Sequence, residues 1–193
     1  ILSAGVINTP QLLMLSGIGK FDHLSQHNIQ TRIDRPGVGQ NLQDQMSTVI
    51  LYKRKDPGPF HRMMRYDRIG RELIKAYLLG SGGATDVPGG ITAFLNSDND
   101  AQLPNLQLLL TAAPLGAWPY LRPFKKPFND GFVSRVVLLD PESRGTITLK
   151  SANILDKPVI KQNFLSTPRD WEVMRAGLRI AREIASQPSM KPF

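Results

Sequence analysis

The sequence predicts an α+β fold in which a mainly antiparallel sheet is backed by helices. Four β-rich segments follow one another without a helical period between them, at 91–95, 106–112, 132–139 and 146–150. Helical periods flank this stretch, one over 63–79 and one that begins at Pro168. Strands grouped together, with helices outside the group, are typical of an α+β domain with an antiparallel sheet.

The first residues predict a strand, a tight turn and a helix. Ile1-Leu2 is apolar and strand-like, and the small residues Ser3-Ala4-Gly5 follow it. Thr9-Pro10 opens an apolar helical run, Gln11 to Leu15, because Thr is a good N-cap and Pro is favoured at the first helical position. The glycines of Ser16-Gly17-Ile18-Gly19 end that helix. A strand that enters a helix through small residues lets a ligand phosphate approach backbone N–H groups at the positive helix end.

The remainder of this N-terminal region is short elements and turns. Residues 21–27 fit a short helix, and the alternation over 29–33 fits an edge strand. We interpret residues 1–45 as the tail of a nucleotide-binding domain and residues 46–193 as a second domain.

The second domain is expected to start with a β-rich segment at 46–52, which Pro57-Gly58-Pro59 interrupts. The helix over 63–79 ends at Gly80 to Gly83, and a further loop is expected at Val87 to Gly90.

Two later features suggest where the second domain exposes and buries its apolar residues. The segment from Pro114 to Gly131 is rich in Pro and aromatic residues, and loops of this length are usually lids or partner surfaces. The helix that begins at Pro168 carries one apolar stripe, which we expect to pack on the sheet. The stripe comprises Trp171, Met174, Leu178, Ala181 and Ile184.

Composition sets further bounds. The chain has 193 residues, of which 41% are hydrophobic and 21% charged, as in ordinary globular domains. No apolar run approaches the roughly 20 residues that a membrane-spanning helix needs. The chain contains no cysteine, which excludes disulfides and thiolate metal sites in this segment and favours a reducing compartment such as the cytoplasm.

The formal net charge is +8, from 24 Lys and Arg against 16 Asp and Glu. Such a balance is compatible with a nucleic-acid or anionic-surface partner. The charges are spread along the chain, however, and no nucleic-acid-binding module is recognisable. We therefore interpret the basic residues as a solvated surface and expect no nucleic-acid partner.

Three segments resemble conserved blocks of the glucose-methanol-choline (GMC) family of flavin oxidoreductases, in the family's order. The segment from Gly5 to Gly19 is similar to the family's second signature, with Val6 where a smaller residue is usual. Arg35 to Gln45 resembles a second block and Leu139 to Asn153 a third. The nearest likeness is to the choline dehydrogenase-like alcohol dehydrogenases.

The resemblance implies that the chain is an internal fragment of an FAD-dependent oxidoreductase acting on the CH-OH group of a small alcohol. In this family the alcohol becomes an aldehyde or ketone as hydride passes to the flavin, and the sheet of the substrate domain covers the flavin. The catalytic His of the family lies in a C-terminal block that follows Phe193, so residues 46–193 would be a C-terminally truncated substrate domain with no catalytic residue. The isolated chain is expected to be inactive. The electron acceptor cannot be assigned from this segment.

Two pairs of residues are the candidates for contact with FAD. Small side chains at Ala4 and Gly5 would let the backbone approach the cofactor; the alternative is a tight strand-helix connection without a ligand. The resemblance places Asn41 and Asp44 in a loop beside the flavin; the alternative is that both side chains cap their own loop.

Three further positions bear on the site. Gln45 replaces the usual family His and cannot titrate near neutral pH. Arg144-Gly145 is expected to form a structural turn in which Arg anchors a carboxylate. The segment 106–111 is expected to line the substrate cavity with alternate residues, although periodicity does not say which set faces inward.

Two other functions remain compatible with the sequence. One is a binding or interaction module without redox chemistry, which would use the basic surface and the aromatic loop. The other is a non-oxidative flavoenzyme of the same family, such as a lyase or a decarboxylase.

Overall fold

The computed structural model describes residues 1–85, 90–98 and 103–190 and divides into two compact units. The first unit comprises residues 1–46 and 141–171, and the second comprises residues 47–140 and 172–193. We expected one boundary and an uninterrupted second domain over 46–193. The chain does change units next to residue 46, but residues 141–171 return to the first unit.

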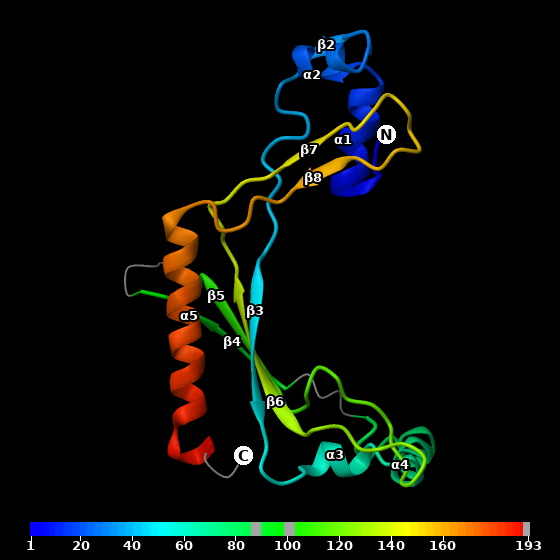
Figure 1. The fold of residues 1–193 in the computed structure, drawn as a ribbon, viewed down its shortest axis with the longest axis vertical. Coiled ribbons are helices and arrows are strands. Elements are labelled where there is room, and N and C mark those ends of the chain that lie inside the picture. Colours follow the sequence, from blue (N-terminus) through cyan, green and yellow to red (C-terminus); the bar gives the residue numbers. More distant parts are fainter. Residues whose placement is uncertain (86–89, 99–102, 191–193) are drawn as a thin grey trace. The chain divides into compact units, whose positions relative to one another are not determined.

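The first unit combines short helices with two small sheets (Figure 1). Its elements are α1 (Gly5–Leu15), β1 (Ile18–Gly19), α2 (Phe21–Gln26), β2 (Ile33–Asp34), β7 (Thr146–Thr148) and β8 (Val159–Lys161). Strands β1 and β2 pair in parallel, and β7 and β8 pair antiparallel. Its buried core is Met14 of α1, Leu24 of α2 and Leu149. This core joins the N-terminal segment to the segment after residue 141.

Helix α1 differs from its expected form. It begins at Gly5, and Pro10 lies inside it rather than at its first position. A proline there leaves the Val6 carbonyl without its usual helical donor, but the helix continues across it to Leu15. The expected strand at Ile1-Leu2 is absent from the described residues, and both side chains are exposed.

The strand expected over 29–33 shares only Ile33 with the observed strand β2. Strand β2 pairs with the two residues of β1. The expected short helix at 21–27 is confirmed as α2.

The second unit is built on a four-stranded antiparallel sheet. Its strands are β3 (Ser47–Lys53), β4 (Ile91–Leu95), β5 (Leu106–Thr111) and β6 (Gly131–Leu138), in the order β3-β6-β5-β4. Its helices are α3 (Pro59–Met63), α4 (Tyr66–Leu79), most of α5 (Pro168–Ser186) and the 3-10 turn Pro188–Met190. The α+β prediction and its antiparallel sheet are therefore confirmed. The strand expected at 146–150 is instead β7, which pairs with β8 in the first unit, and most of the loop expected at 87–90 lies outside the described residues.

One face of this sheet packs against α5 (Figure 1). A Cβ placed on Gly177 would lie 2.5 Å from Val136 and 3.0 Å from Leu106, so the helix backbone approaches β5 and β6 closely at a residue without a side chain. Leu106 and Leu108 are buried on this face. Because successive side chains alternate, Gln107 and Leu109 lie on the face opposite α5. Of the predicted helix stripe, Met174 and Ala181 are buried, whereas Trp171 is 45% exposed.

Candidate functional site

The second and third sequence blocks pair with each other in the first unit. The Leu42 N–H donates to the Gly145 carbonyl over 3.0 Å, and the Gly145 N–H donates to the Leu42 carbonyl over 2.7 Å. The Ile147 N–H donates to the Gly39 carbonyl over 2.7 Å. These bonds hold the loop that contains Asn41 and Asp44 against the start of β7.

Two glycines permit this pairing. A Cβ on Gly39 would lie 2.1 Å from the Ile147 carbonyl oxygen, and the φ angle of Gly39 is +77°. A Cβ on Gly145 would lie 2.1 Å from the Lys161 carbonyl oxygen and 2.8 Å from that of Gln162. Both clashes are with backbone, which cannot move aside without separating the strands. Gly39 of the second block and Gly145 of the third are therefore required by the packing.

Asn41 and Asp44 behave differently within this loop. Asp44 accepts a hydrogen bond from the Gln45 N–H (2.9 Å) on one oxygen and from Gln162 Nε2 (3.0 Å) on the other. Asp44 thus fastens the loop to its own backbone and to Gln162. Asn41 has a left-handed backbone (φ 58°), is exposed, and its side chain makes no hydrogen bond within the described residues. Its amide is available to a ligand.

Ala4 and Gly5 lie at the N-terminal end of α1. Ala4 is the N-cap and makes no side-chain capping bond, and both residues are exposed. Gly5 has a φ of +80°, and a Cβ there would have nothing within 4 Å. The first N–H groups of a helix have no intrahelical partner, so this end is open to an acceptor. Within the described part of the chain, no hydrogen bond links this pair to Asn41 and Asp44.

A buried carboxylate that sequence reasoning missed organises the third block. Asp170, 1% exposed, accepts hydrogen bonds from the Glu142 N–H (2.8 Å), the Ser143 N–H (3.0 Å) and the Ser143 hydroxyl. Burial by itself would raise the pKa of Asp170, but these bonds together lower it below its ordinary value. The sequence offers only a weak sign of this contact. Ser143 directly precedes the Arg144-Gly145 turn, and Asp170 lies in the first turn of the helix that begins at Pro168.

Contrary to the expectation, no carboxylate pairs with Arg144 in the part of the chain that the structure describes. Its guanidinium donates to the Pro141 and Ser143 carbonyl oxygens, and Asn163 Nδ2 donates to the Arg144 carbonyl over 3.0 Å. The Arg144-Gly145 turn is structural, and its Arg is held by backbone oxygens because these lie nearest in the turn.

His23 is a structural residue in the same unit. The Leu149 N–H donates to its Nε2 over 3.0 Å, so this nitrogen carries no proton in the folded state. Partial burial, then the neighbouring His27 and Lys20, lower the pKa of His23.

The first unit is therefore expected to lose stability on acidification. Because the folded-state pKa of His23 lies below its ordinary 6.5, the contribution is present above pH 6.5 and is lost as the pH falls through the lower value. Urea denaturation between about pH 8 and pH 5 measures this. His23→Gln, which retains an acceptor, should flatten the dependence over this range, whereas an unchanged slope in the variant would contradict the assignment.

Within residues 1–85, 90–98 and 103–190, no group of three or more His, Cys, Asp and Glu side chains could hold a metal ion. Among the same residues no helix is both long and apolar enough to cross a membrane.

Comparisons with known proteins agree with the block pattern. Family models described as GMC oxidoreductase match residues 1–47 and residues 141–193. These ranges contain the first two blocks and all of the third except its first two residues, and the chain belongs to the GMC oxidoreductase family.

The relatives are similar along nearly the whole chain. It is 38% identical over 195 residues to an uncharacterised GMC-type oxidoreductase of Mycobacterium tuberculosis. That alignment covers 96% of this chain and 34% of the relative. It is 34% identical to an oxygen-dependent choline dehydrogenase of Brucella ovis, over 100% of this chain and 34% of that protein. A solved formate oxidase of Aspergillus oryzae, studied for modification of its FAD, is 25% identical with a TM-score of 0.76 and covers 99% of this chain and 37% of that one. The chain spans about a third of the length of the curated relatives it matches.

Proposed function

We propose that the protein carrying this chain is an FAD-dependent oxidoreductase that converts the CH-OH group of a small alcohol to a carbonyl. The observation that carries this proposal is the junction of the second and third family blocks in one unit, through Gly39 and Gly145, in a chain that belongs to the GMC family. The choline dehydrogenase relative supports oxidation of an alcohol, and the formate oxidase neighbour supports FAD-dependent oxidation in the wider sense.

The residues at the open end of α1 fit a flavin nucleotide. Gly5 leaves free space where a side chain would stand, and the first-turn N–H groups are donors without helical partners. The unpartnered amide of Asn41 offers a further donor and acceptor. We propose that Ala4, Gly5 and Asn41 contact FAD and that Asp44 shapes the loop that presents Asn41. The bound flavin would supply hydride acceptance; the protein groups supply position and hydrogen bonds.

We propose that the two units bind different molecules. The first unit would form part of the FAD-binding domain, and the second would be the substrate-binding domain. We propose that the sheet face opposite α5 lines the substrate cavity. On this face Gln107 and Leu109 stand beside Phe94, which is 60% exposed, and Arg135, which is opposite Leu109 in the register.

Flavin retention in the intact protein tests the cofactor contacts. Ala4→Leu adds a bulky side chain at an exposed position and should reduce bound FAD at least tenfold, because it occupies the space that the backbone needs for close approach. Ser25→Leu adds the same side chain at an exposed position of α2 and should leave flavin content unchanged. Equal flavin absorbance in both purified variants would contradict the contact.

Product analysis on the intact protein separates oxidation from lyase or decarboxylase chemistry. Oxidation predicts an aldehyde or ketone formed in step with a reduced electron acceptor. A carbonyl product without any reduced acceptor would favour the non-oxidative alternative.

A further inference from the structure

The second unit contains a cavity of about 650 Å³ that the proposed function does not use. It lies between the α3–α4 segment and the loop that leads into β6. Four guanidinium groups line it, from Arg62, Arg65, Arg68 and Arg122. Its volume is within the range of pockets that hold small organic ligands.

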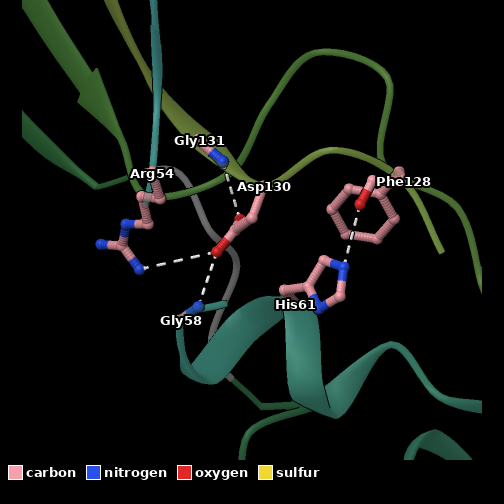
Figure 2. Close-up of polar contacts among 6 residues, drawn as sticks. All are labelled: Arg54, Gly58, His61, Phe128, Asp130 and Gly131. Atoms are coloured by element: carbon pink, nitrogen blue, oxygen red, sulfur yellow. Dashed lines mark hydrogen bonds and ion pairs between the residues drawn. The ribbon is translucent and has the colours of Figure 1, made fainter. Parts of the chain in front are cut away.

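Hydrogen bonds fix both walls of this cavity. The Tyr120 N–H donates to the Met64 carbonyl, and the Tyr66 N–H donates to the Tyr120 carbonyl, each over 3.0 Å. His61, 6% exposed, places Nε2 2.9 Å from the Phe128 carbonyl oxygen (Figure 2). Because that oxygen can only accept, Nε2 carries the proton. The loop wall is thus attached to α3 and to the start of α4.

Asp130 attaches the end of the loop to the beginning of α3 (Figure 2). Its carboxylate accepts from the Gly58 N–H over 2.6 Å and from the Gly131 N–H over 2.8 Å, and Arg54 lies 3.9 Å away. The arginines around the cavity are therefore presented by a connected framework.

The positive charge of the cavity is only partly neutralised. Arg65 forms a bidentate pair with Asp67 at 2.6 Å and 2.5 Å, and these hydrogen bonds lower the pKa of Asp67 to about 2. Among the described residues, Arg62, Arg68 and Arg122 have no carboxylate within ion-pair distance. Asp56 is the single acidic residue among those that line the cavity.

Three guanidinium groups with no carboxylate within ion-pair distance suit a phosphoryl group, whose oxygens accept the parallel N–H bonds that arginine donates. The charge of Arg68 also acts on Asp67 without forming an ion pair. The rest of the lining is largely apolar and includes Tyr120, which is 8% exposed, and Leu121. An organic group attached to the phosphate would contact this wall. A lone inorganic ion would leave it unused.

We propose that this cavity binds a soluble phosphate ester, with its phosphoryl group held by Arg62, Arg68 and Arg122 and its organic part against Tyr120 and Leu121. This binding requires neither flavin nor alcohol turnover, so its failure and the failure of the proposed function are separate results.

Isothermal titration of the full chain with phenyl phosphate tests the proposal. The double variant Arg62→Gln/Arg122→Gln should weaken binding at least tenfold, because two charge-assisted donors are lost. Arg71→Gln is the matched control, since Arg71 lies on α4 outside the cavity lining and is 67% exposed; it should leave affinity within about twofold. Raising salt from about 50 mM to about 200 mM should weaken binding to the unmodified chain.

Three further measurements show whether the cavity binds a soluble phosphate ester. Circular dichroism and the thermal midpoint of each variant confirm that the fold is retained, since both substituted arginines are exposed. Absence of binding at about 1 mM phenyl phosphate, or equal affinity in the double variant, would overturn the proposal. Vesicles that contain phosphatidic acid provide a second arm. Chain that sediments with them but binds no phenyl phosphate would identify a lipid headgroup instead and would also overturn the soluble ligand.

Discussion

Replacing Gly145 with alanine is expected to destabilise the first unit by at least about 3 kcal/mol. The added Cβ would lie 2.1 Å from the Lys161 carbonyl oxygen and 2.8 Å from that of Gln162. Relieving the clash means separating β7 from β8 or breaking the two bonds between Leu42 and Gly145. Urea denaturation followed by circular dichroism measures the free energy of unfolding.

Gly37→Ala is the matched control for this experiment. Gly37 belongs to the second block, and a Cβ there would meet nothing within 4 Å. We expect a change within about 0.5 kcal/mol. If Gly145→Ala proved as mild as Gly37→Ala, the contact between the second and third blocks would not exist as described.

Asp170→Ala is expected to have the second large effect, a loss of about 3 kcal/mol or more. The substitution removes the acceptor of a buried N–H, that of Ser143, and of a partly buried one, that of Glu142. Asp22→Ala is the comparison, because Asp22 is 70% exposed and forms a surface ion pair with Lys20 at 3.6 Å. Exposed ion pairs contribute little, so this substitution should change stability by less than about 1 kcal/mol. Thermal and urea denaturation of the two variants provide the comparison.

The Asp170 effect should also depend on pH. Its folded-state pKa is lowered, so its contribution is present above the ordinary carboxyl pKa of 3.8 and is lost as the pH falls through the lower folded value. The stability difference between the unmodified chain and Asp170→Asn should therefore shrink in acid below about pH 4. A difference that stays constant down to about pH 2 would show that the carboxylate charge is not what the network recognises.

The sequence predicted most of the second unit because its signals are local. β-rich segments and amphipathic periods identified β3 to β6, α4 and α5. Side chains alternate along a strand, so the two faces of β5 could also be told apart within the strand itself. The expected start of α1 was wrong because the rule that places Pro at a helix start does not exclude Pro10 from the second turn. The missed strand β8 has only three residues, Val159–Lys161, which is too short to show an alternating pattern.

The return of residues 141–171 to the first unit could not be predicted locally. It depends on contacts across about a hundred residues, such as Leu42 with Gly145 and His23 with Leu149. The same holds for the candidate site. Sequence resemblance selected Asn41 and Asp44 together, whereas the structure separates a loop-fastening Asp44 from an unpartnered Asn41. His61 is likewise positioned by distant residues, because it lies buried against the rings of Tyr120 and Phe128.

The absorbance spectrum of the intact protein, recorded anaerobically before and after addition of an alcohol, tests the central claim most directly. We expect the two-banded spectrum of oxidised flavin and its bleaching as a primary or secondary alcohol from a small panel is consumed. A purified, folded protein that carries no flavin, or a flavin that no alcohol in the panel reduces, would contradict the assignment.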